Sequence, residues 1–302
     1  MKYPTLKQLR YFVALTETNH FGRAAAACFV SQSAFSTAIQ ELERMLDTQL
    51  VDRTNRQVTV TATGQEVAVR ARLCIRDVKA LVEVAGQQRE PLTGDLRLGV
   101  IPTIAPFLLP GFLPKLHKEY PGLKLYLIED QTIRIHQRLL DGELDLILLA
   151  LPFELRSVEQ MPLFKDRFRL ACRKNTDRVD PHNYRFSRLD ADSVLLLEDG
   201  HCLRDHALAA CKIRNTEKVS RFAASSLLTL VEMVDADLGI TFLPEIAEGS
   251  SILKNTRVRT YEVDDRSHRT IGIAWRKGSA RAPEFQLFGR LIAENRRQES
   301  AR

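Results

Sequence analysis

The spacing of apolar residues divides this chain of 302 residues into three stretches. In the first, about residues 5–64, it predicts three short helices, with Asn19 as the N-cap of the second and Ser31 as the N-cap of the third. The third helix, over 32–46, has apolar residues at steps of 4, 3 and 4 that form one face: Phe35, Ile39, Leu42 and Leu46. After Leu50 the sequence alternates and is rich in β-branched residues, which predicts a small hairpin, or wing.

The second stretch, from Gly64 to about Gln88, has a regular apolar repeat. Its members follow each other at steps of 4, 3, 4, 3 and 4, and they are Val67, Ala71, Cys74, Val78, Leu81 and Ala85. A seven-residue repeat of this kind predicts a long helix that pairs with another helix. The alternative is an amphipathic helix that packs only on its own domain.

The third stretch follows a Pro/Gly break over 89–94 that indicates a hinge. Strands are expected over 96–101, 123–129 and 144–149, helices over 107–119 and 132–141, and later strands near 167–173 and 193–198 with a helix near 225–237. This alternation predicts an α/β fold, with a mostly parallel sheet and helices on both faces. Ligands of such sheets bind at the carboxyl ends of the strands.

Composition limits the classes of function. Hydrophobic residues make up 44% of the chain and charged residues 27%, which is ordinary for a folded globular protein. The apolar runs are far shorter than the ~18 residues of a membrane span, and the first residues do not resemble a secretory signal, so we expect a cytoplasmic protein without a membrane partner. Lys and Arg number 44 against 38 Asp and Glu, and the net charge of +6 is compatible with nucleic acid without requiring it.

The five cysteines are Cys28, Cys74, Cys172, Cys202 and Cys211. An odd, scattered set does not fit the disulfide framework of a secreted protein, and in a reducing compartment all five would be thiols. The chain has no CxxC pair, so we expect no metal site, and no motif indicates a cofactor.

The second and third helices, joined near Val30, predict a helix-turn-helix. Short polar side chains on the third helix can reach phosphates or base edges, Gln can bind adenine through two hydrogen bonds, and wing arginines can lie over the backbone. The candidate contacts to double-stranded DNA are Ser31, Gln32, Ser33, Ser36, Thr37, Gln40, Arg53 and Arg56. The alternative is a small helical domain whose exposed face is merely polar.

Residues 21–43, FGRAAAACFVSQSAFSTAIQELE, resemble the N-terminal signature of the LysR-type transcriptional regulators, as do LVDRT at 50–54 and TATG at 61–64. The resemblance extends over the whole chain. It implies a regulator that activates or represses transcription at a promoter operator and is not an enzyme. It also implies a homodimer or, more usually, a homotetramer with paired linker helices, and RNA polymerase as a further partner.

The same resemblance implies a domain organisation. An all-α winged helix-turn-helix is expected over 1–63, a linker (dimerisation) helix over 64–90, and a regulatory, redox-sensing domain over 91–302. The regulatory domain would have two Rossmann-like subdomains, as in periplasmic binding proteins. Subdomain I would comprise about 94–164 and 269–302, and subdomain II about 165–268.

Residues 197–211, LEDGHCLRDHALAAC, resemble the sensor segment of the peroxide-sensing OxyR branch of this family. The thiolate of Cys202 would attack hydrogen peroxide, which requires a lowered thiol pKa. A possible helix start at Cys202 and the neighbouring His201, Arg204 and His206 all favour a thiolate. Attack gives a sulfenic acid, which a second thiol can capture as a reversible disulfide, and Cys211 is the only candidate nearby.

By the same resemblance, the residues that would bind peroxide or support its site are Thr103, Thr132, His201, Arg204, Asp205 and Arg269. If 203–211 is helical, the α-carbons of Cys202 and Cys211 lie about 13 Å apart. A disulfide requires about 7 Å or less. We therefore expect oxidation to refold this segment, shift the packing of the regulatory domains and move the DNA-binding heads, with control of oxidative-stress genes as the output.

Two other functions stay open. One is a LysR-type regulator that binds a small metabolite in the cleft between the subdomains, with incidental cysteines. The other is a thiol peroxidase, which is disfavoured because a turnover enzyme needs no winged helix. The remaining cysteines, Cys28, Cys74 and Cys172, are expected to be ordinary structural thiols.

Overall fold

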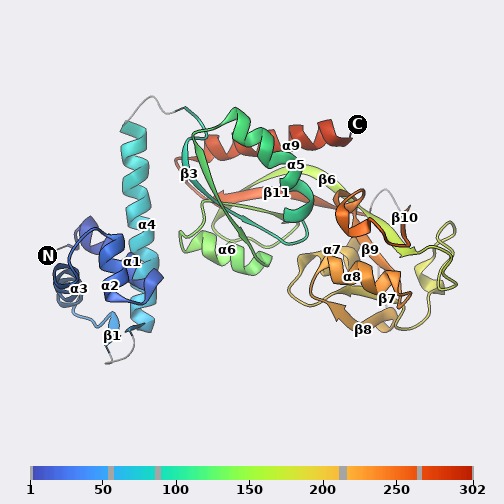
Figure 1. Cartoon of the computed structure of the whole chain (residues 1–302), viewed down its shortest axis with the longest axis horizontal. Coiled ribbons are helices and arrows are strands. Elements are labelled where there is room, and N and C mark those ends of the chain that lie inside the picture. The colour runs from blue at the N-terminus through green and yellow to red at the C-terminus, as the bar shows by residue number, and fades with distance from the viewer. Residues whose placement is uncertain (1–2, 54–57, 86–89, 211–215, 264–266, 301–302) are drawn as a thin grey trace. The chain divides into compact units, whose positions relative to one another are not determined.

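The structure, a computed structural model, describes residues 3–53, 58–85, 90–210, 216–263 and 267–300 (Figure 1). The chain divides into two compact units: residues 1–89 with 140–143, and residues 90–139 with 144–302. Within the described residues, no helix is both long and apolar enough to cross a membrane.

The first unit contains the predicted helix-turn-helix and wing. α1 (Leu6–Thr18), α2 (Phe21–Ala27) and α3 (Gln32–Leu46) surround an apolar core, and β1 (Val51–Arg53) pairs antiparallel with β2 (Val58–Val60). α3 begins where predicted because the Ser31 hydroxyl accepts a hydrogen bond from the Ala34 amide.

The prediction that Asn19 caps the second helix is wrong. Asn19 ends α1 in the left-handed conformation, with φ of 48°, which asparagine adopts more readily than most residues. The N-cap of α2 is His20, whose Nδ1 accepts the Arg23 amide at 3.2 Å. Asparagine suits either end of a helix, so the sequence did not separate the two roles.

The predicted long helix is α4 (Ala62–Ala85), which packs against α1. It begins beside the wing, where the Thr61 hydroxyl accepts the Gly64 amide at 2.9 Å. Toward its C-terminal end, Val78, Leu81 and Val82 are exposed. The described residues of this chain therefore leave that part of the apolar repeat uncovered.

The second unit alternates strands and helices as predicted. β3 (Gly94–Val100) pairs in parallel with β4 (Leu123–Glu129) and β5 (Leu146–Leu151), and the connecting helices are α5 (Ala105–Glu119) and α6 (Thr132–Leu140). In Figure 1, α5 lies with α9 (Ala282–Ser300) on one face of the sheet, and α6 covers the other.

The sheet is mixed, so the expectation of a mostly parallel sheet is only partly right. β11 (His268–Arg276) runs antiparallel to β5 and to β6 (Val158–Arg173), and β6 also pairs antiparallel with β9 (Thr241–Pro244) and β10 (Val258–Glu262). β6 has 16 residues, many more than predicted, since Pro162 and several charged side chains hide its alternation. This long strand runs through both halves of the unit, and β11 pairs beside it over most of its length.

Two apolar cores occupy this unit. Core I gathers buried side chains of β3, β5, α5, β11 and α9. Core II gathers those of the second half of β6, of β7 (Val194–Leu197), which pairs in parallel with β8 (Val219–Ala224), and of α7 (Cys202–Ala210) and α8 (Leu227–Asp235). Short 3-10 turns are η1 (Phe186–Arg188), η2 (Thr216–Lys218), η3 (Glu245–Ala247) and η4 (Ser251–Leu253).

Candidate functional site

Cys202 lies at the junction of the two cores. It is the first residue of α7 and is 6% exposed. Its side chain packs in core I, whereas Leu203 and Ala207 of the same helix pack in core II. The approach to the helix requires Gly200, which has φ of +97° and whose Cβ, if added, would lie 3.0 Å from the Gln131 side chain.

The predicted lowering of the Cys202 pKa is wrong for this arrangement. Burial raises the pKa of the thiol, while a contact from the Thr132 hydroxyl and the positive charge of Arg269 oppose the rise. Arg204, which was expected to favour a thiolate, instead pairs through its Nε with Asp199 Oδ1 at 3.0 Å. Desolvation therefore outweighs the local positive charge, and the thiol form is favoured.

Arg269 of β11 is fully buried and connects β6 with the turn that precedes α5. Its Nε donates to Oδ2 of Asp166 on β6 at 2.9 Å. One terminal nitrogen donates to the Thr103 hydroxyl at 2.9 Å, and the other to the Thr103 carbonyl at 3.0 Å. The second carboxylate oxygen of Asp166 accepts the Ile246 amide at 3.0 Å. These bonds fix the guanidinium near Cys202.

Asp166 is the site residue that sequence reasoning missed. Its only signal is a charged residue within the apolar alternation of a strand, which is more often solvent-exposed than buried. Burial raises the pKa of its carboxyl, and the charge of Arg269 opposes that rise. Only the folded chain reveals the partner, because 103 residues separate the two side chains in sequence.

Thr132 supplies unused hydrogen-bonding capacity. It is the first residue of α6 and is 1% exposed. Its hydroxyl is close enough to Cys202 to lower the pKa of the thiol. Among the described residues, however, no group meets the distance and angle criteria for a hydrogen bond with it. An unsatisfied buried hydroxyl costs about 1–3 kcal/mol. A small polar molecule beside Cys202 would recover part of that cost.

Among the predicted site residues, the structure thus brings together Thr103, Thr132, Cys202 and Arg269. The other three, His201, Arg204 and Asp205, are close to Cys202 along the chain. His201 is buried, with Nε2 4.0 Å from the Glu198 carboxylate, and Asp205 is exposed. The predicted partner thiol, Cys211, lies outside the described residues.

His206 has two unlike ring nitrogens. It is 8% exposed, and its Nε2 donates to the carbonyl oxygen of Pro152 at 2.9 Å. Its Nδ1 is buried and has no partner among the described residues. Burial lowers the pKa of the imidazole, and the hydrogen bond to Pro152 opposes this. The ring is therefore neutral near pH 7.

The predicted DNA-contacting residues of α3 lie on one polar face. Ser31, Gln32, Ser33, Thr37 and Gln40 are exposed, and Ser36 is half-buried. The Thr37 hydroxyl donates to the Ser33 carbonyl at 3.0 Å, so it is partly used within the helix. Arg53 ends β1, and Arg56 falls outside the described residues.

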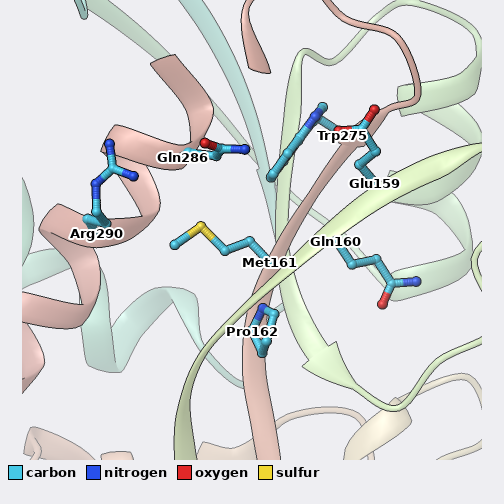
Figure 2. Close-up of a pocket in the computed structure, with 7 residues that line it drawn as sticks. All are labelled: Glu159, Gln160, Met161, Pro162, Trp275, Gln286 and Arg290. Carbon is cyan, nitrogen blue, oxygen red and sulfur yellow. The ribbon is translucent and has the colours of Figure 1, made fainter. Parts of the chain in front are cut away.

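A shallow groove of about 470 Å³ lies elsewhere in the second unit (Figure 2). β6, β11 and α9 line it with Glu159, Gln160, Met161, Pro162, Trp275, Gln286 and Arg290. None of the predicted sensor residues belongs to this lining. The groove and the cysteine site are therefore separate features of the same unit.

Comparisons with known proteins assign both units to one family. Residues 6–65 match the bacterial regulatory helix-turn-helix protein, lysR family, and residues 89–297 match the LysR substrate binding domain. The chain is 44% identical over 286 residues to the HTH-type transcriptional regulator EstR of Acinetobacter baylyi, covering 94% of this chain and 95% of that protein.

Two further relatives bear on the cysteine site. The chain is 38% identical over 287 residues to the hydrogen peroxide-inducible genes activator of Escherichia coli, covering 95% of this chain and 94% of that protein. A full-length OxyR variant from Pseudomonas aeruginosa superimposes with a TM-score of 0.80 at 31% identity, covering 98% of this chain and 95% of that one. These matches confirm the predicted fold class.

Proposed function

The chain belongs to the LysR family of DNA-binding transcription regulators, which are not enzymes, and on that premise we propose that it senses hydrogen peroxide through Cys202. The sensed signal is stored as a reversible Cys202–Cys211 disulfide and controls oxidative-stress genes. The observation that carries the proposal is the buried thiol of Cys202 beside Thr132 and the fixed guanidinium of Arg269. The similarity to a peroxide-inducible genes activator and to OxyR supports it.

The chemistry follows from these groups. Cys202 loses its proton, and the sulfur attacks one peroxide oxygen as the O–O bond breaks. The departing hydroxide takes up a proton, so the products are a sulfenic acid and water, with the sulfur oxidised and the peroxide reduced. The charge of Arg269 favours both the thiolate and the departing hydroxide. Thr103, Thr132 and His201 would hold the peroxide, with Arg204 and Asp205 in the surrounding polar network.

The second step forms the disulfide. The Cys211 thiol attacks the sulfenic sulfur, and water leaves. The helical run of α7 supports a refolding step: from Cys202 to Ala210 it advances the chain about 12 Å at the usual rise per residue. A disulfide requires its two α-carbons within about 7 Å, so we expect α7 to unwind when the bond to Cys202 forms.

DNA recognition and assembly complete the proposal. The polar face of α3 and the wing, with Arg53 and Arg56, contact the operator, and α4 pairs with the α4 of a second copy in a homodimer or homotetramer. The exposed apolar side chains of Val78, Leu81 and Val82 support this pairing. The same proposal includes the predicted domains, which are 1–63, 64–90 and 91–302, the last with two subdomains. It also includes RNA polymerase as a partner.

A metabolite-responsive LysR regulator is the second candidate. The match of residues 89–297 to the LysR substrate binding domain and the raised pKa of the Cys202 thiol support it, and the 44% identical relative EstR is not named as a peroxide regulator. The two candidates differ in what Cys202 does, because a metabolite sensor does not need its sulfur.

The test combines mass spectrometry with DNA footprinting. After brief peroxide exposure of the full-length protein, we expect Cys202 to be oxidised first and a Cys202–Cys211 disulfide to follow, with a changed footprint. Cys202→Ser abolishes both changes, whereas Cys172→Ala, which removes another buried thiol, preserves them. A peroxide response that survives in Cys202→Ser would favour the metabolite candidate.

A further inference from the structure

His206 connects the two cores. α7, which carries it, packs against β7 and β11, and Ala207 beside it lies in core II. The acceptor of its hydrogen bond is the carbonyl of Pro152, directly after β5, a strand of core I. His206 is only 8% exposed, whereas Pro152 is exposed, so the hydrogen bond is shielded from solvent on the donor side.

The position of His206 relates it to Cys202. The two residues are four apart on one helix and therefore lie on the same face, one turn from each other. A movement that takes Cys202 out of α7 would also displace His206. The carbonyl of Pro152 would then lose its donor, and the imidazole would leave a buried position.

We propose that His206 is a positioning residue, a latch that holds α7 on the end of β5 and thereby limits the exposure of the Cys202 thiol. The latch itself is a property of α7 and can be measured without peroxide. Its consequence for signalling rests on the proposed function: a weaker latch lets α7 unwind more often and speeds formation of the disulfide.

Nδ1, which has no hydrogen-bond partner among the described residues, makes the latch sensitive to pH. In the part of the chain that the structure describes, the charged groups that act on the ring are Asp205 on its own helix and Arg269 on β11, which is paired with Asp166. Cys202, one turn away on the same helix, is also titratable. His268 precedes Arg269 and points to the opposite face of β11, and β7 carries only Val and Leu. Protonation of Nδ1 would add a cation near Arg269 without supplying an acceptor, so acid should open the latch.

The experiment measures opening of α7 in the reduced full-length protein. The readouts are hydrogen exchange of α7 amides and the alkylation rate of Cys202 with iodoacetamide, located by mass spectrometry. At pH 7.5 we expect His206→Ala to react about fivefold faster than wild type, the change that one lost hydrogen bond gives. His206→Gln, which keeps an N–H donor, should lie close to wild type, and His182→Gln, an exposed histidine of the same unit, should match it.

The pH arm separates a latch from a merely structural role. Between pH 7.5 and 5.5, opening should increase in wild type and His182→Gln but not in His206→Gln, with exchange rates corrected for the intrinsic effect of pH. Equal opening in wild type and both His206 variants at both pH values would overturn the latch. So would a pH response retained by His206→Gln.

A peroxide arm distinguishes this inference from the proposed function. If His206→Ala opens faster but peroxide leaves wild-type Cys202 unmodified, the latch stands and the peroxide function fails. If peroxide oxidises Cys202 normally and the variants open at the wild-type rate, the latch alone fails. If both hold, His206→Ala should form the disulfide faster than wild type.

Discussion

Individual buried charges and thiols show how far tertiary burial changes side-chain chemistry in this protein. Cys202 stands among cationic residues in the sequence, but burial raises the pKa of its thiol. Arg269 and Asp166 are both 0% exposed and depend on each other for compensation. Removing one partner of such a pair leaves the other charge buried and unpaired, which costs far more than the pair contributes when intact.

Arg269→Ala should therefore destabilise the protein by about 3–5 kcal/mol, because Asp166 loses its buried partner. Chemical denaturation of reduced wild type and variant gives the free energy of unfolding. Arg257→Ala is the matched control, since Arg257 is 62% exposed and its Nε lies 3.8 Å from Asp235; it should cost less than about 1 kcal/mol. Similar costs for the two variants would contradict this account.

Cys172 of β6 gives a prediction in alkaline solution. Burial raises the pKa of its thiol from 9.0 to about 11. Above pH 9 the unfolded thiol ionises while the folded one keeps its proton, so the stability present below pH 9 is lost as the pH rises toward 11. Cys172→Ala should reduce this loss by about 2 kcal/mol in denaturation curves measured from pH 8 to 11. A variant with the wild-type pH dependence would rule out Cys172 as a source.

At the scale of elements, two helices carry the proposed signal. α7 places Cys202 and His206 on one face and joins the two cores, whereas α4 presents an apolar stripe that the described residues do not cover. A regular row of exposed apolar side chains on a helix is more typical of an interface with a protein partner than of a surface that faces water. The seven-residue repeat makes a second α4 the natural occupant.

Leu81→Glu should weaken self-association, because it places a charge in the proposed α4–α4 contact, where Leu81 is 67% exposed in the single chain. Sedimentation equilibrium should show at least a tenfold weaker dimer, which corresponds to about 1.4 kcal/mol. Tyr3→Glu is the control, as Tyr3 is also an exposed apolar residue of the first unit. An unchanged association constant for Leu81→Glu would exclude this face of α4.

At the scale of the whole molecule, β6 links the two cores of the second unit. Val158, Met161 and Phe164 pack on core I from its first half, and Phe168 and Leu170 fill core II from its second half. The strand is paired with β11 over most of its length. A change of packing in one core therefore has a covalent, hydrogen-bonded route to the other.

Phe168→Ala should consequently lower the hydrogen-exchange protection of β3 and β5, which lie in core I, although Phe168 packs in core II. A buried Phe-to-Ala change costs about 3–5 kcal/mol, and a cooperative unit loses that stability throughout. Leu228→Ala, an exposed position on α8, should leave the protection unchanged. Loss of protection confined to core II would show that the two cores open independently.

Local patterns predicted most of the elements. The predicted boundaries of α3 and β4 agree with the structure. Both elements have an uninterrupted periodicity, and α3 also has an N-cap serine; these signals act over a few residues. The sequence also predicted that polar residues lie on one face of α3 and that Cys202 lies near the start of a helix. The length of β6 was underestimated because charged residues interrupt its apolar alternation. Asn19 was assigned to the wrong helix end because asparagine can cap either end and α1 and α2 adjoin there.

Sequence alone was enough to predict the order of helices and strands, the helix-turn-helix and the cysteine proposed as the sensor, because these depend on neighbours in the chain and on side-chain chemistry. Tertiary structure decided the direction of the Cys202 pKa shift, the pairing of Arg269 with Asp166 and the bond from His206 to Pro152. Burial and long-range contacts set these properties. A charged residue that is near in sequence has little effect on the thiol pKa when its side chain pairs elsewhere, as Arg204 does with Asp199.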